Sequence, residues 1–527
     1  MKEKHTMVSK GEFKKKAALS RRQFLKLSAA GGGSLAVSSG LGGILLARSA
    51  PVFAQGNTNL VAAVGAEPPS LDPQAIEQRI PQMITWNIYE PLIDRDDQGR
   101  TIPWLAESWE QIDNTTTRFK LREGISFHNG EAFNADAAVF SVNRIVAPEL
   151  ASQWIGVVGT IKNATKVDDM TIDIETHDVD PILLGRLTAL AMMAPGWTQE
   201  VGDEVSSTTN GTGAYKLRNW HRNVQVELES NEGYWGGAPS IKSATLRIIG
   251  EDSTRFQSVK TGEIDIYLGP LPDHLPELPK FEAPLAQEFS MVRLSNLEGS
   301  PIADRRIRQA MNYAVDKELI LQQLHAGLGT VSPGQLSAPG MFGYNPNLAP
   351  YPFDLDQAKS LLAEAGAEGL EIDYVAPKGR YAGDAILNQA IAEMLEQAGL
   401  KVNLNLLDPQ SWVRFGDRNQ TPVPPSCWYL VHSNSLFDAD RTVSSYYTDE
   451  SPFSAYHNDE IRTLFEAARV ELDVAEREKI YHRAFELGRE DPPAIFMLQL
   501  VDLWALTERT QFKPRPDGRF ILRTMSL

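Results

Sequence analysis

The sequence has a single cysteine, Cys427, in 527 residues. One thiol permits no internal disulfide and no cysteine-rich metal cluster, so a large hydrophobic core must stabilise the fold. The position of Cys427 also excludes a lipid anchor on a cysteine directly after an N-terminal leader.

The familiar catalytic motifs are missing as well. The chain has no HExxH motif, no G-x-S-x-G elbow and no GxxxxGK[ST] phosphate loop. Its nine histidines include no pair at i, i+4, the spacing that places two imidazoles on one helix face. We therefore expect no enzyme activity, no bound metal and no other cofactor.

Three acidic segments are weak candidates for chemistry. Asp178 with Asp180, and Asp438 with Asp440, would suit acid–base catalysis if buried close together, but solvated turns or helix starts are the simpler interpretation. Residues 94–99 open like a calcium loop, yet the twelfth position is Leu105 where a bidentate Glu is needed. We expect a polar turn between two strands there.

The N-terminus has the order of an export leader. Lysines and the pair Arg21-Arg22 come first, an uncharged run covers residues 27–47, and small residues end at Ala54. The stretch SRRQFLK resembles the twin-arginine signal, which carries folded proteins across the bacterial inner membrane. Six glycines within the uncharged run argue against a permanent membrane span. We expect residues 1–54 to be a signal peptide, cleaved near Ala54, and the mature protein to be periplasmic.

The remaining chain is acidic. Residues 1–54 carry ten Lys/Arg and two Asp/Glu, so their removal takes the formal net charge from −17 to −25. Such a surface repels nucleic-acid phosphates and anionic lipid and disfavours self-association. We expect no nucleic-acid partner and a monomer.

Hydrophobic periodicity indicates an α/β protein. Val224, Val226 and Leu228 alternate as in a half-buried strand, whereas residues 307–314 and 461–468 have helical spacing. Residues 384–407 switch from a helical pattern to an alternating one at Gly399. About 470 residues of mature chain imply two or three domains.

Two segments are candidates for ligand contact. In the first, Trp428 and Tyr429 precede Ser433, Asn434 and Ser435, a mixture of flat apolar faces and short polar groups that is typical of small-molecule clefts. A core strand followed by a loop fits the same residues.

The second candidate segment is the cationic loop at residues 377–381, where Arg380 and Tyr381 precede a helix. Arg380 can grip a carboxylate bidentately. A solvated surface turn is the alternative.

Several longer stretches together resemble one known family. They are LAESW at 105–109, FKLREGISFHNGE at 119–131, GTGAYKL at 211–217, YWGG at 234–237, TGEID at 261–265, DRRIRQAMNYAVD at 304–316 and AKSLLAEAG at 358–366. In this order they are similar to the family 5 extracellular solute-binding proteins, which bind dipeptides, oligopeptides or nickel for ABC importers. The resemblance runs from about residue 60 to the C-terminus.

This resemblance implies a type II periplasmic-binding-protein fold, with two α/β lobes that close about a hinge and an extra inserted domain. The implied division is lobe I at 55–92, 209–272 and 493–527, the inserted domain at 93–208 and lobe II at 273–492. The implied function is capture of a peptide-like or other small polar organic solute and its delivery to an ABC permease in the inner membrane. A periplasmic chaperone or signalling co-receptor on the same scaffold is the alternative, and a hydrolase is less favoured.

One departure from the family bears on the ligand. Peptide-binding members usually carry an aspartate that pairs with the ligand's α-amino group, and alignment by eye places Ser435 there. A neutral serine leaves a buried ammonium unpaired, at a cost of several kcal/mol. Capture of ordinary dipeptides is therefore in doubt.

Overall fold

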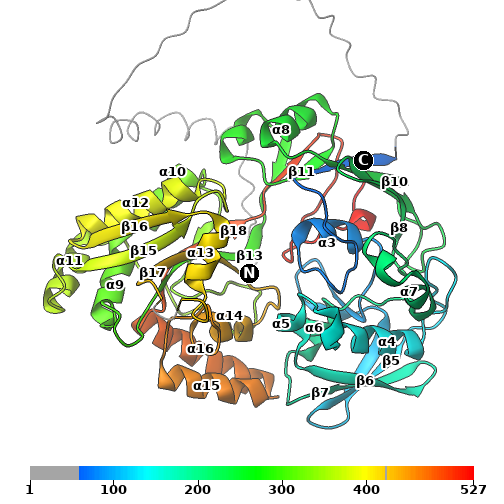
Figure 1. The fold of residues 1–527 in the computed structure, drawn as a ribbon, viewed down its shortest axis with the longest axis horizontal. Helices are drawn as coiled ribbons and strands as arrows, with labels where there is room; N and C mark the ends of the chain where they lie inside the picture. The colour runs from blue at the N-terminus through cyan, green and yellow to red at the C-terminus, as the bar shows by residue number, and fades with distance from the viewer. Residues whose placement is uncertain (1–57, 422–423) are drawn as a thin grey trace, which may run out of the picture.

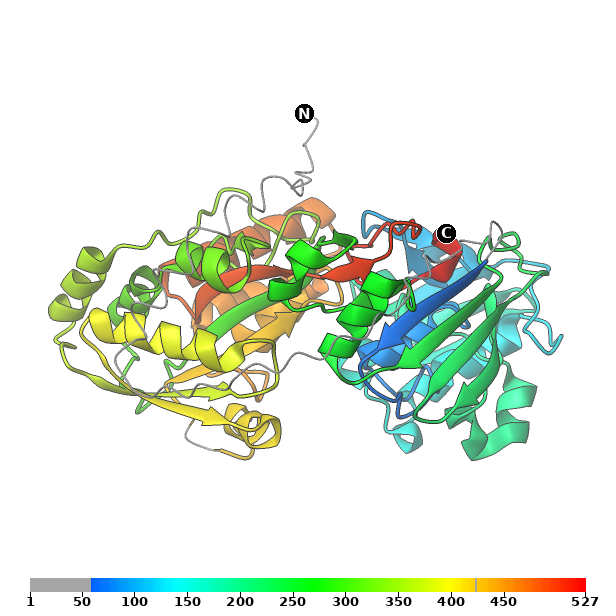
Figure 2. The same ribbon diagram turned by 90° about the horizontal axis from the view of Figure 1, so that it is seen from above.

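The computed structural model describes residues 58–421 and 424–527, so the expected leader lies outside the described residues. Figures 1 and 2 show two lobes that lie side by side and are joined by two extended crossings. Within the described ranges, no helix is long and apolar enough to cross a membrane.

The first lobe is built on a seven-stranded sheet in the order β12-β19-β11-β1-β10-β9-β8. The central strand β1 pairs in parallel with β10 and β11, and the other neighbours are antiparallel. Helix α8 packs Phe256 and Val259 on one face, whereas Leu60 and Leu246 belong to the core on the other. The elements are β1 (Asn59–Val64), α3 (Arg79–Thr85), β8 (Tyr215–His221), β9 (Gln225–Ser230), β10 (Ser243–Ile248), α8 (Asp252–Thr261), β11 (Ile266–Leu268), β12 (Lys280–Glu282) and β19 (Trp504–Leu506).

A segment inserted between β1 and β8 forms a separate small layer beside this sheet. Its antiparallel sheet has the order β4-β5-β7-β6, and helix α4 packs Val142 and Ile145 against Phe119 and Ile172. A two-stranded ribbon, β2 with β3, leads into it. The elements are β2 (Ile93–Arg95), β3 (Thr101–Pro103), β4 (Ala106–Gln111), β5 (Thr116–Leu121), α4 (Ala135–Val146), α5 (Ile155–Val158), β6 (Ile161–Asp168), β7 (Thr171–Thr176), α6 (Leu183–Leu187) and α7 (Pro195–Val201).

The second lobe has a six-stranded sheet in the order β14-β18-β13-β17-β15-β16. Helices α9, α11 and α12 bury their apolar sides on one face, and α14, α15 and α16 cover the other. The elements are β13 (Leu285–Leu294), α9 (Arg305–Ala314), α10 (Lys317–Leu324), β14 (Thr330–Val331), α11 (Leu355–Glu364), β15 (Glu371–Pro377), α12 (Asp384–Gln397), β16 (Lys401–Leu407), α13 (Pro409–Gly416), β17 (Cys427–Ser433), α14 (Ala439–Tyr446), α15 (Asp459–Val470), α16 (Val474–Glu490) and β18 (Ala494–Val501).

The chain crosses between the lobes twice, and the two crossings lie side by side. The first joins β12 to β13 and the second joins β18 to β19, with the Asp502 N–H donating to the Pro284 carbonyl at 3.0 Å. Two predicted boundaries are therefore misplaced. The first lobe continues through β12 rather than ending at residue 272, and the return at 493 is too early because β18 pairs with β13 in the second lobe.

Several local features of the fold follow directly from residue type. The Asp354 side chain caps α11 by accepting from the Gln357 N–H, and Gly399 has φ +109° between α12 and β16. Gly211 is required by close packing, because a Cβ there would lie 1.9 Å from the Ile88 carbonyl oxygen. Phe127 and Phe133 are buried in the core of the inserted segment.

Candidate functional site

The space between the lobes is lined near the crossings by charged groups from both sides. Arg79, the first residue of α3, places one guanidinium nitrogen 2.5 Å from a carboxylate oxygen of Asp502 on the second crossing. Its other terminal nitrogen lies 3.9 Å from Glu288 on β13. Burial raises the pKa of Glu288, and the Arg79 charge opposes that shift. Arg79 thus links the first lobe to the crossing and to the second lobe.

Tyr381 stands on the second-lobe side of this space. Its hydroxyl accepts from the Val431 N–H at 3.4 Å, and its ring meets the Tyr429 ring edge-on at 6.1 Å. Burial raises the pKa of Tyr381, with the Glu288 charge a smaller contribution in the same direction. Glu288 in turn pairs with Ser433 across β13 and β17. Tyr381, Glu288 and Ser433 therefore form one patch beside the crossings.

The loop that holds Tyr381 is fixed by the carboxylate of Asp384. That carboxylate accepts from the backbone N–H groups of Gly379, Arg380 and Tyr381 at 2.8–3.0 Å. The Arg380 side chain is exposed, with its guanidinium 5.8 Å from the Tyr381 ring centroid. Arg380 therefore has an anchored backbone and an exposed side chain, and its contact with a ligand stays a prediction.

Farther from the crossings, the loop between β17 and α14 docks directly on the other lobe. Leu436 is buried in the hydrophobic cluster of the inserted segment, and its carbonyl accepts from Arg95 at 2.9 Å. The Arg95 guanidinium also lies 4.7 Å from the Phe437 ring centroid, a cation–π contact. Phe437 has φ +57°, an uncommon conformation for a bulky residue. This docking loop joins the lobes independently of the crossings.

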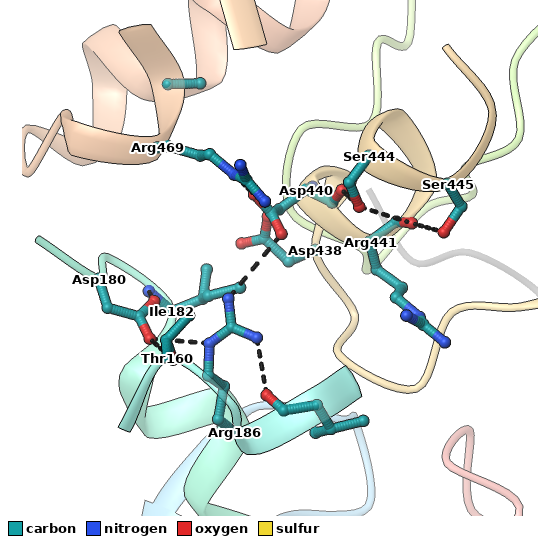
Figure 3. Close-up of polar contacts among 12 residues, drawn as sticks. Thr160, Asp180, Ile182, Arg186, Asp438, Asp440, Arg441, Ser444, Ser445 and Arg469 are labelled. Carbon is teal, nitrogen blue, oxygen red and sulfur yellow. Dashed lines mark hydrogen bonds and ion pairs between the residues drawn. The ribbon is translucent and has the colours of Figure 1, made fainter. Parts of the chain in front are cut away.

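Helix α14 begins in a buried network of acids and arginines (Figure 3). Asp438 is the N-cap of α14 and makes a bidentate pair with Arg477 at 2.7 and 2.8 Å. Asp440 lies 3.5 Å from Arg469 and 3.9 Å from Arg186 of the inserted segment. Burial raises the pKa of Asp440, and Asp438 adds to the shift.

Three of the four acids considered for catalysis pair with arginines, whereas Asp178 is exposed. The sequence favoured solvated turns or helix starts for these acids: Asp438 does start helix α14, but Asp438 and Asp440 are both buried. Asp180 pairs with Arg186 at 2.8 Å and accepts from the Thr160 hydroxyl at 2.6 Å. Of these contacts, only the one between Asp440 and Arg186 crosses between the lobes.

A pocket of about 370 Å³ opens beside this network, between α5 and α6 of the inserted segment and α14 and α15 of the second lobe. Volumes of roughly 300–1,000 Å³ are usual for small-molecule sites. Three arginines and one carboxylate line the pocket, so its wall is positive on a protein whose formal net charge is −17. The lining residues are Ile155, Gly156, Gly159, Thr160, Arg186, Leu436, Asp440, Arg441, Ser444 and Arg469.

The seven residues predicted to contact a ligand differ in how exposed they are in the structure. Trp428 and Tyr429 are only 3% and 2% exposed and pack within the second lobe, Trp428 stacking on Trp412 at 5.0 Å. Asn434 is fully buried, and its amide donates to the Asp438 carbonyl. These three residues are packed inside the second lobe, which agrees with the alternative interpretation of a core strand followed by a loop. Their direct contact with a ligand stays a prediction.

The other four predicted residues are accessible. Arg380 and Ser433 are exposed, and Tyr381 and Ser435 are half-buried. The sequence did not point to Arg79, Glu288 or Arg441, because each lies in a stretch with ordinary helix or strand patterning. In the part of the chain that the structure describes, no group of three or more His, Cys, Asp or Glu side chains could hold a metal ion.

Comparisons with known proteins agree with this architecture. A glutathione-binding protein GsiB of Pectobacterium atrosepticum is 27% identical over 466 residues, covering 85% of this chain and 90% of that protein. The structure of HbpA2 from Haemophilus parasuis has a TM-score of 0.80 at 22% identity, covering 89% of this chain and 99% of that one. The periplasmic binding protein DppA from Helicobacter pylori, in complex with the peptide STSA, has a TM-score of 0.72 at 23% identity, covering 89% and 98%.

The fold is that of the type II periplasmic binding proteins, with two α/β lobes. Residues 100–451 match the family model described as bacterial extracellular solute-binding proteins, family 5 Middle, and this match spans more than half of the chain. The chain belongs to the family 5 bacterial extracellular solute-binding proteins.

Proposed function

We propose that this protein is the periplasmic substrate-binding subunit of an ABC importer and captures a small, peptide-like or other polar organic solute between its lobes. The observation that carries the proposal is the interlobe pocket, whose polar lining comes from both lobes in a chain of this family. The relatives named for glutathione and peptide binding point to the same solute class.

The mechanism follows from where the contacts lie. A solute that touches Arg186 on one wall and Arg441 on the other gains both contacts only when the lobes are together. Binding therefore shifts the equilibrium between separated and joined lobes, because the solute interacts more favourably with the joined state. A permease in the inner membrane would recognise the joined lobes, and no covalent chemistry is involved.

The export route is part of the proposal. Residues 1–54 would direct the folded protein through the twin-arginine pathway, with cleavage near Ala54. Replacing Arg21 and Arg22 together by lysine should retain the charge but abolish export, so that uncleaved protein accumulates in the cytoplasm. Export of the Lys-Lys variant at the normal rate would contradict this route.

The proposed function is tested on purified mature protein. Native mass spectrometry reports a solute that copurifies, and thermal-shift screening covers glutathione, short peptides, opine-type amino-acid conjugates and sugars. A ligand at about 100 times its Kd should stabilise the fold by about 2.7 kcal/mol, which gives a clear rise in Tm. Absence of any adduct and of any shift across the panel would overturn the proposal.

A further inference from the structure

Arg441 differs from the other arginines near α14 because no acid in the described part of the chain forms an ion pair with it. Arg186 pairs with Asp180, Arg469 with Glu450 and Arg477 with Asp438. No carboxylate of the described residues lies within 4.0 Å of the Arg441 guanidinium. Its Nε is buried without a hydrogen-bond partner in the structure.

An arginine in this condition has unsatisfied binding capacity. The guanidinium stays charged at any physiological pH and presents five N–H donors in a planar fork. A buried donor that lacks an acceptor is unfavourable, and more so when it belongs to a charged group. The fork matches the two oxygens of a carboxylate, which would satisfy two donors at once.

The side chain extends across the interface toward the inserted segment. In Figure 3 Arg441 leads away from the Asp440 carboxylate, and no dashed line reaches its guanidinium. A Cβ built on Gly156 of α5 would lie 3.9 Å from one of its terminal nitrogens. The absence of a side chain at Gly156 therefore keeps open the part of the pocket that the guanidinium faces.

Glu77 of the first lobe does not take the place of a partner. Burial raises the pKa of Glu77, and the Arg441 charge opposes the shift, so the two groups sense each other. They form no ion pair in the described structure, and the Glu77 N–H is bonded to the Gln153 side chain at 3.0 Å.

We infer that the pocket between α5 and α14 receives a carboxylate group of the bound solute and that Arg441 is the residue that pairs with it. Arg186 and Arg469 add positive charge, and Asp440 between them holds both side chains in place. This inference rests on the proposed function and deepens it, since it predicts that the solute itself carries a carboxylate group. It also fits the neutral Ser435, because recognition then depends on the anionic end of the solute.

The test uses glutathione and its diethyl ester as probes, with binding measured by isothermal titration. Arg441→Gln should weaken glutathione binding by about 30-fold, because a neutral amide cannot form a charged, bidentate pair with the carboxylate. Esterification should weaken binding to the unmodified protein by a similar factor and have little further effect on the Arg441→Gln protein. Arg483→Gln, on the exposed side of α16, is the matched control and should bind as the unmodified protein does.

Two further variants separate this role from structural ones. Gly156→Leu fills the pocket from the opposite wall and should weaken glutathione binding without any change to α14. Glu77→Gln distinguishes ligand binding from a lobe-to-lobe attraction: if Arg441 served only to attract Glu77, both variants would weaken binding equally. We expect Glu77→Gln to leave binding unchanged or to strengthen it.

The outcomes are distinct. Equal glutathione affinity in the Arg441→Gln and Arg483→Gln proteins would overturn the inference and leave the proposed function intact. Binding confined to uncharged or cationic solutes, with glutathione and simple dicarboxylates inactive, would do the same. No binding of any compound would overturn the proposed function and this inference with it.

Discussion

At the scale of single residues, Glu90 shows how this protein buries a carboxylate without a cation. Its two oxygens accept from the indole N–H groups of Trp104 and Trp235, the Tyr234 hydroxyl and the Thr212 hydroxyl, at 2.6–2.9 Å. Burial raises the pKa of Glu90, and these four donors oppose the shift. The carboxylate therefore ties the ribbon of the inserted segment to the first lobe.

Glu90→Gln should be strongly destabilising. An amide offers one acceptor oxygen, so its NH₂ group would face two donors that now lack an acceptor. We expect a loss of about 2–3 kcal/mol in the unfolding free energy, seen as a lower urea midpoint. Glu368→Gln, at an exposed position, is the control. Equal midpoints for the two variants would contradict this account.

His432 makes the fold sensitive to acid. Burial lowers the pKa of His432 to about 3, and the nearby Arg441 adds to the shift. The unfolded chain takes up the proton near pH 6.5, whereas the folded protein does so only near pH 3. The unfolded state thus binds more protons between these values, so stability falls as pH drops from 6.5 toward 3.

His432→Gln should flatten this dependence, because it removes the titrating group but retains a hydrogen-bonding partner for Thr442. The measurement is Tm from pH 7 to pH 4.5 for this variant and for His221→Gln, whose side chain is 51% exposed. His432→Gln should lose less stability on acidification than the control. Identical pH profiles would show that His432 does not contribute.

At the scale of elements, the features that could be predicted from the sequence are those set by residues close together in the chain. The helix-to-strand switch at Gly399 and the amphipathic helix α9 are both present where expected. The docking loop was not predicted, since no local rule assigns φ +57° to Phe437. The pocket was missed for a related reason. Arg441 and Gly156 are 285 positions apart and meet only when the lobes dock.

Two substitutions at Gly185 test the docking loop. A Cβ at Gly185 would lie 3.5 Å from Arg95 and 3.6 Å from the Leu436 carbonyl, which is ordinary contact. Gly185→Ala should therefore leave lobe docking unchanged. Gly185→Leu should displace the docking loop from the inserted segment. The radius of gyration in small-angle scattering should then rise, and solute binding should weaken mainly through faster dissociation. If both variants scatter as the unmodified protein does, the loop is not what holds the lobes together.

At the scale of the whole molecule, most of the core of each lobe is separate, and the lobes meet at the crossings, the docking loop, the α14 network and the contact between Arg79 and Glu288. The crossings are bonded to each other, since Leu285 pairs with Val501 directly beside the contact between Asp502 and Pro284. Such an arrangement favours rigid-body rotation of one lobe against the other over deformation within a lobe. The family resemblance implies the same hinge. The residues that hold the two lobes together, in contrast, could be identified only from the structure.

Spin labels can follow this rotation because the native thiol will not interfere. Cys427 is fully buried, and burial raises the pKa of its thiol, so labelling reagents should not reach it as a thiolate. Cysteines at the exposed positions Lys162 and Glu466 report the distance between the inserted segment and α15, whereas Glu393 with Glu466 reports within the second lobe. A saturating solute such as glutathione should shorten and narrow the first distance distribution and leave the second unchanged. If solute narrows neither distribution although calorimetry shows that it binds, capture does not require lobe rotation, and the joined lobes of this structure are its resting state.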